Sequence, residues 1–183
     1  MFAHVDTLKA LTDEHIHKFN TILPNDIVIK SIEEVLENKH ARFDAISRSY
    51  EYRILIGRDP FLLETTWQIH QKQIQLEKMN EAAEILFQYQ DFESFSKVKT
   101  DVKTFNCTIM KAVWKLEGNQ LVFHIKANRF LRNMVRAIVG TLLDVGLEKK
   151  SVDDFRNIIE SKKRSEAGLS VPAKGLFLTE VNY

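Results

Sequence analysis

Apolar and polar residues alternate along several short stretches of the chain, a pattern typical of strands with one buried face. The clearest stretch runs from Tyr50 to Ile56, where Tyr50, Tyr52, Ile54 and Ile56 share a face. Residues 107–117 and 120–127 are two further runs, and the Gly118-Asn119 pair between them indicates a hairpin. We also expect strands at residues 1–6, 26–32 and 175–183.

Apolar residues recur at helical spacing in other segments. Ile16, Phe19 and Leu23 form a stripe that ends before Pro24. Longer helices are expected in residues 73–89 and 128–146, and Ser151 is positioned to cap another. Because separate helices interrupt strands that are joined by hairpins, the pattern predicts an α+β fold with a largely antiparallel sheet and helices packed on one face.

The composition indicates what kind of protein this is, but it does not indicate a function. The 183 residues are 44% hydrophobic and 28% charged, as expected for one large globular domain or one domain with part of another. The net charge of +1 carries no nucleic-acid signature, so a basic surface needs local clustering. The single Cys107 has no disulfide partner and no metal-ligand spacing, which favours a buried thiol in a reducing cytoplasm. No apolar run is long enough for a membrane span, and residues 1–6 do not resemble a signal peptide.

The segment from Asn128 to Gly146 combines positive charge with a glycine. If it is helical throughout, Arg129, Arg132 and Arg136 fall within about 60° of one another. No acidic residue occurs from Asn128 to Leu143, and a glycine inside a helix costs about 1 kcal/mol relative to alanine. We therefore expect another group to approach Gly140 closely. The arginines fit two interpretations, an anion-binding surface or an ordinary solvated helix face.

Four segments resemble, in order, the motifs of the tRNA pseudouridine synthase A family. They are His40–Tyr52, Asp91–Phe95, Asn128–Gly140 and Pro172–Leu178. Phe2-Ala3-His4 is similar to the strand that follows the family's catalytic loop. The resemblance implies that residues 1–39 are the end of the N-terminal domain and that residues 40–183 are the C-terminal pseudouridine synthase domain.

The family isomerises uridine to pseudouridine in the anticodon arm of tRNA, at positions 38–40. The reaction moves the glycosidic bond from N1 to C5 without net redox change or hydrolysis, so the resemblance implies no external cofactor and no metal. It also implies a cytoplasmic homodimer with the anticodon stem-loop as its partner.

The resemblance assigns roles to individual residues. Tyr50 would stack on the target uracil and help to accept the C5 proton, Arg136 would orient the catalytic carboxylate, and Leu176 would pack against the base. We therefore expect Tyr50 and Arg136 to face a shared cavity. Candidates for phosphate contacts are Arg48, Lys126, Arg129 and Arg132. Each residue also has an ordinary interpretation, as core packing for Tyr50 and Leu176 and as surface charge for the others.

The family's nucleophilic aspartate lies in a Gly-Arg-Thr-Asp loop just before the strand that Phe2-Ala3-His4 resembles. The 183 residues do not contain that loop, and we expect Met1 to be an internal methionine and this polypeptide alone to be inactive. Gly57-Arg58-Asp59-Pro60 is only partly similar and is better interpreted as a turn. Two alternatives stay open, a non-catalytic RNA-binding module and a purely structural domain.

Overall fold

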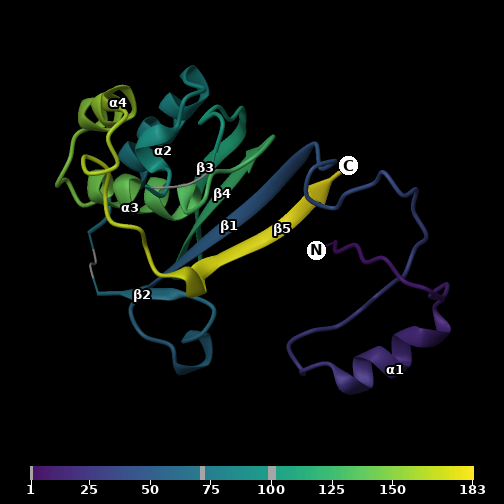
Figure 1. The fold of residues 1–183 in the computed structure, drawn as a ribbon. Coiled ribbons are helices and arrows are strands. Elements are labelled where there is room, and N and C mark those ends of the chain that lie inside the picture. Colours follow the sequence, from purple (N-terminus) through teal and green to yellow (C-terminus); the bar gives the residue numbers. More distant parts are fainter. Residues whose placement is uncertain (1, 71–72, 99–101) are drawn as a thin grey trace. The chain divides into compact units, whose positions relative to one another are not determined.

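The chain forms two compact units, Phe2–Asp44 and Ala45–Tyr183. The computed structural model describes residues 2–70, 73–98 and 102–183 (Figure 1). No helix within these ranges is long and apolar enough to cross a membrane. The boundary predicted after Lys39 concerns the domains of the family and stays a prediction.

The larger unit is built on a sheet with β1 (Ser47–Ile56) at its centre. One edge of β1 pairs with β4 (Gln120–Ala127), which pairs in turn with β3 (Ile109–Glu117). Along the other edge run β5 (Leu176–Asn182), which is antiparallel, and the short parallel β2 (Trp67–Ile69). The predicted hairpin is confirmed between β3 and β4, and among the strands of the described residues β2 alone departs from the antiparallel arrangement (Figure 1).

Three helices cover one face of this sheet, namely α2 (Leu76–Ile85), α3 (Met134–Gly146) and α4 (Val152–Ser161) (Figure 1). Tyr52 and Phe123 from the sheet are buried in the same core as Ile138 of α3. Ser151 caps α4 as predicted, through a reciprocal pair of hydrogen bonds with Asp154. Short 3₁₀ turns complete the unit at Pro60–Leu62, Leu86–Gln88, Glu93–Phe95 and Ala173–Gly175. The predicted α+β fold is confirmed.

The helix predicted from Asn128 begins six residues later, at Met134. The Oδ1 atom of Asn128 accepts a hydrogen bond from the Thr108 amide at 2.8 Å, which keeps this segment beside β3. Asn133 then adopts a left-handed conformation with φ of 71°, which a helix does not allow. Arg129 and Arg132 therefore precede the helix, and the predicted stripe of three helical arginines is wrong for these two.

The smaller unit contains one helix, α1 (Glu14–Ile22), which ends before Pro24 as predicted. The strands predicted at 1–6 and 26–32 are wrong for the described positions 2–6 and 26–32, which run without strand structure. A strand needs a neighbour for its backbone hydrogen bonds, and within the described residues none pairs with either segment. Instead, the Asn20 side chain bonds the backbone of Ile29.

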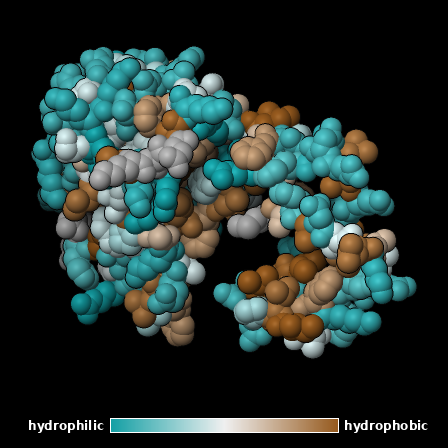
Figure 2. Space-filling model, in the orientation of Figure 1, coloured by the Kyte–Doolittle hydropathy of each residue, from teal (hydrophilic) through white to brown (hydrophobic). Residues whose placement is uncertain are grey.

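Many apolar side chains of this smaller unit are exposed, as the brown surface in Figure 2 shows. They include Phe2, Val5, Leu8, Ile22, Ile27, Val28, Val35, Leu36 and Phe43. Such a high apolar exposure is typical of a surface that another chain segment covers.

Candidate functional site

An open cavity of about 660 Å³ lies beside the first turn of α3. Two predicted site residues, Arg136 and Leu176, both line it. The complete lining is Lys97, Val98, Arg132, Asn133, Arg136, Arg164 and Leu176. Four of these side chains are cationic and none is acidic, so the cavity suits an anionic group.

Arg136 is held by main-chain groups. Its Nε donates a hydrogen bond to the Val171 carbonyl oxygen, and the Val171 amide donates to the Arg136 carbonyl oxygen at 3.3 Å. Within residues 2–70, 73–98 and 102–183, no carboxylate forms an ion pair with Arg136. The guanidinium is thus oriented while its charge stays without a counter-ion.

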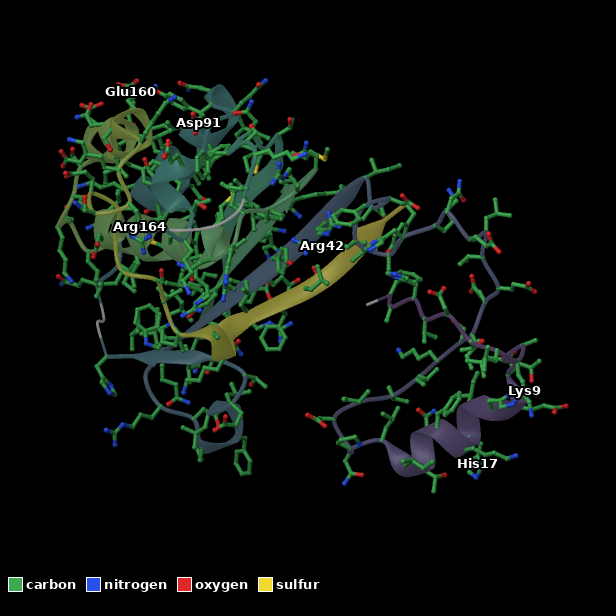
Figure 3. All side chains as sticks on the ribbon, viewed as in Figure 1. Lys9, His17, Arg42, Asp91, Glu160 and Arg164 are labelled. Carbon is green, nitrogen blue, oxygen red and sulfur yellow. The ribbon has the colours of Figure 1, made fainter. Side chains whose placement is uncertain are left out.

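The segment 164–172, which we call the clamp loop, fixes this arrangement. Arg164, labelled in Figure 3, donates from Nη1 to the Gly168 carbonyl at 3.1 Å and from Nη2 to the Ser170 hydroxyl at 2.8 Å. The Leu169 carbonyl oxygen lies so close to Gly140 that a Cβ there would stand 1.9 Å from it. The close approach predicted from Gly140 is therefore confirmed, and backbone of the clamp loop is the group that makes it.

Tyr50 lies on the same face of β1 as Tyr52, but it is not among the residues that line this cavity as the structure describes it. Its ring meets the edge of Phe130, with ring centres 5.1 Å apart. Burial raises the pKa of the Tyr50 phenol, and the nearby charge of Arg48 opposes that shift. Tyr52 is the tyrosine whose pKa the charge of Arg136 lowers, against a larger rise caused by burial.

Leu176 is the point where β5 reaches the cavity. In the pairing of β5 with β1, Leu176 lies opposite Tyr52 and Leu178 lies opposite Tyr50. The Tyr52 hydroxyl donates to the Pro172 carbonyl oxygen at 2.7 Å, which fixes the approach of the chain to β5. The structure thus brings Arg136 and Leu176 together and places Tyr50 two residue pairs further along the sheet.

The four predicted phosphate contacts are dispersed. Arg132 lines the cavity, whereas Arg129 lies near Cys107, where burial raises the thiol pKa and the charge of Arg129 partly opposes that rise. Arg48 reaches toward the Asn128 carbonyl oxygen, at 3.5 Å. Lys126 forms an ion pair with Glu180 at 3.0 Å and faces away from the helices, since its neighbours Ile125 and Ala127 are the residues in the core.

Sequence reasoning did not single out Lys97 or Arg164. Lys97 lies two residues after the motif Asp91–Phe95, and this nearness was the one feature of the sequence that could have pointed to a role for it in the site. The buried Phe95 and the hydrogen bond from the Ser94 hydroxyl to the Ile158 carbonyl anchor the motif. No pattern marked Arg164, because its role depends on the fold of the clamp loop.

The turn at Gly57–Pro60 supplies no carboxylate to the cavity. The Asp59 side chain accepts a hydrogen bond from the Phe61 amide at 2.8 Å and caps the 3₁₀ turn that follows. This confirms that the segment is a turn. Among the described residues, no group of three or more His, Cys, Asp or Glu side chains is arranged to hold a metal ion.

Comparison with known sequences identifies the protein family to which this chain belongs. A family model described as tRNA pseudouridine synthase matches residues 82–183, which contain every residue that lines the cavity. The chain belongs to the tRNA pseudouridine synthase family. This family is one of isomerases, and the resemblance carried by the motifs is confirmed.

Relatives named tRNA pseudouridine synthase A extend the similarity across the whole chain. The protein of Parabacteroides distasonis is 50% identical over 100% of this chain and 73% of its own length. That of Porphyromonas gingivalis is 52% identical over 91% of this chain and 66% of its own length. A more distant relative, from Anoxybacillus flavithermus, is 39% identical over 98% and 74% of the two chains. The chain therefore spans only part of the tRNA pseudouridine synthases that it matches.

Proposed function

We propose that this chain provides the arginine side of the active site of a tRNA pseudouridine synthase. The substrate is then uridine in the anticodon arm of tRNA, at positions 38–40. The observation that carries the proposal is Arg136, a guanidinium oriented by main-chain groups in a cationic cavity, without a carboxylate partner in the described part of the chain. Membership of an isomerase family supplies the chemistry that this geometry serves.

The reaction breaks the N1–C1′ bond of uridine, forms a C5–C1′ bond, removes the proton from C5 and adds one at N1. Arg136 would hold and stabilise the nucleophilic carboxylate, because arginine presents paired donors that match the two oxygens. Removing one partner of a buried ion pair typically costs about 3–5 kcal/mol. The arginine is thus built for a partner that the family's Gly-Arg-Thr-Asp loop supplies, and residues 1–183 do not contain that loop.

We assign the base itself to the apolar part of the site. Leu176 would pack against an everted uracil, and Tyr50 would stack on it after a small movement of the half-buried ring. Because burial raises the pKa of Tyr50, its phenol is protonated at neutral pH. Acceptance of the C5 proton by this residue therefore requires the phenol to lose its own proton first.

RNA binding by Arg48, Arg129, Arg132 and Lys126 belongs to the same proposal, as do the homodimer and the cytoplasmic location. Arg132 has the strongest support, since it lines the cavity and forms no ion pair within the described ranges. Lys126 would have to exchange Glu180 for a phosphate.

A non-catalytic RNA-binding module is the second candidate. The observation behind it is the cation-rich cavity, which would bind an RNA phosphate whether or not catalysis follows. The two candidates differ in one respect: only the enzyme becomes active when the family's catalytic loop is supplied.

The test uses release of tritium from C5-labelled uridine in an anticodon-arm RNA. We expect no release with residues 1–183 alone and clear release when they are fused behind a family segment that carries the Gly-Arg-Thr-Asp loop. In the fusion, Arg136→Met should abolish release, because the aspartate loses its counter-ion. The matched control is Arg156→Met on α4, whose guanidinium bonds Gln88 away from the cavity. An inactive but RNA-binding fusion would favour the second candidate, and activity of residues 1–183 alone would contradict the proposed division of the site.

A further inference from the structure

We propose that Lys97 and Arg132 form a subsite for one RNA phosphodiester at the mouth of the Arg136 cavity. The inference rests on the proposed function and deepens it, because it assigns the backbone of the target nucleotide to two named cations. Arg136 is then reserved for the carboxylate, and Lys97 gains a role that no sequence pattern gave it.

The two residues come from distant parts of the chain and are joined by main-chain contact. The Lys97 amide donates a hydrogen bond to the Arg132 carbonyl oxygen at 3.0 Å. Both side chains line the cavity and both residues are exposed. The subsite is therefore open to a polymer from solvent.

The backbone that carries Lys97 is fixed from behind. Phe95, two residues earlier, is fully buried and stacks on Phe155 of α4, with ring centres 5.8 Å apart. Ser94 bonds the Ile158 carbonyl of the same helix at 2.6 Å. The motif 91–95 thus holds the start of the loop against α4 and delivers Lys97 to the cavity.

Charge identifies the class of ligand. Within the described ranges Lys97 and Arg132 form no ion pair. Of the two acids in the motif, Asp91 (labelled in Figure 3) is paired with Lys162 at 2.7 Å, and neither Asp91 nor Glu93 lines the cavity. Arg136 and Arg164 add two more positive charges to the same cavity. Like charges gathered in one cavity repel one another unless an anion neutralises them, and lysine and arginine are the usual donors to phosphate.

The layout of the cavity matches a nucleotide. Leu176 provides an apolar surface inside, while Lys97 and Arg132 stand at the exposed rim. A nucleotide presents an apolar ring face on one side and an anionic diester on the other, so the base would enter toward Leu176 and the diester would stay at the rim. A free carboxylate would need only Arg136.

The first measurement is the affinity of the 183-residue chain for an anticodon stem-loop RNA, followed by fluorescence anisotropy at several salt concentrations. We expect Lys97→Met to weaken binding about fivefold and to lower the log–log salt slope by about 0.7–0.9, the amount that one phosphate contact contributes. The matched control is Lys115→Met. Lys115 is an exposed lysine of β3 whose neighbour Trp114 points into the core, so it faces away from the helices. Its replacement should change neither quantity.

The second measurement replaces single phosphates beside the target uridine with neutral methylphosphonates. At one position we expect the wild-type chain to lose about fivefold in affinity and the Lys97→Met chain to lose nothing further, because the same contact is already gone. The subsite is refuted if the losses in affinity from the methylphosphonate and from Lys97→Met multiply at every phosphate position. It is also refuted if the Lys97→Met chain binds RNA as tightly as the wild-type chain. Absence of any RNA binding by the wild-type chain would also refute the subsite. The proposed function is judged separately, by tritium release from the fusion, so the two failures are distinguishable.

Discussion

The orientation of Arg136 shows how single residues can prepare a site before its partner arrives. The Val171 carbonyl oxygen accepts a hydrogen bond from Nε of Arg136, and the side chain lines the cavity. A neutral carbonyl oxygen holds the side chain without neutralising its charge. A carboxylate in the same place would hold the side chain and also neutralise the charge. The charge therefore remains for a group that the described residues do not provide.

Cys107 provides a prediction at the same scale. Burial raises its thiol pKa from 9.0 to about 11, with the charge of Arg129 as the smaller opposing influence. Below pH 9 the thiol is protonated in both states, so it does not affect the free energy of unfolding. Between pH 9 and 11 the unfolded thiol ionises while the folded thiol cannot, so the free energy of unfolding should fall by at most about 2–3 kcal/mol.

The measurement is urea unfolding of the wild-type chain and of Cys107→Ala at pH 8 and pH 10.5. Tyr50, Tyr52 and Tyr89 also have raised pKa values and contribute a common slope to both proteins. We expect the alanine variant to lose less stability between the two pH values. Equal losses in both proteins would contradict a shifted thiol.

At the scale of elements, the contact between α3 and the clamp loop is the most demanding packing in the site. Gly140→Ala would place a methyl group 1.9 Å from the Leu169 carbonyl oxygen. Alanine stabilises a helix by about 1 kcal/mol relative to glycine. This gain is outweighed, because the new methyl group clashes with the Leu169 main chain, which cannot rotate away as a side chain can. We expect a net loss of about 1–3 kcal/mol in the free energy of unfolding, measured in urea.

Gly146→Ala is the matched control, because the atoms nearest its new methyl group belong to the side chains of Met79, at 2.4 Å, and Ile74, at 3.1 Å. Side chains can shift where the main chain cannot, so we expect a smaller loss in the free energy of unfolding than at Gly140. An equal or larger loss at Gly146 would contradict the view that main-chain contact makes Gly140 necessary.

The sequence predicted those elements whose signal is local. The alternation from Tyr50 to Ile56 and the Ser151 cap lie within a few residues, and both are confirmed. The start of α3 was missed because it depends on Asn128 bonding Thr108, twenty residues away. The three-residue β2 was missed because only its pairing with β1 makes it a strand.

The same distinction separates the parts of the site. Arg136 and Leu176 lie within motifs, so a resemblance could point to both before their shared cavity was known. Lys97 and Arg164 enter that cavity only because α3, the loop after Phe95 and the clamp loop converge there. Such convergence has no counterpart in the spacing of residues along the chain.

At the scale of the whole molecule, unpaired sheet edges bear on whether copies of the chain associate in solution. Within the described residues, β5 pairs only with β1 and β3 only with β4, so the far edges of both strands are open. Open edges offer backbone donors and acceptors to other chains. Charged side chains on an edge strand are a common way to prevent such pairing.

We therefore expect residues 1–183 to self-associate as concentration rises, with β5 as one route. Thr179 is an exposed residue in the middle of β5, and Thr179→Lys should shift the sedimentation velocity distribution toward monomer. Asn157→Lys adds the same charge to an exposed position of α4 and should leave the distribution unchanged. The comparison separates edge pairing from a general effect of net charge. A monomeric wild-type chain at high concentration would contradict self-association, and equal association of both variants would exclude the edge of β5 as its route.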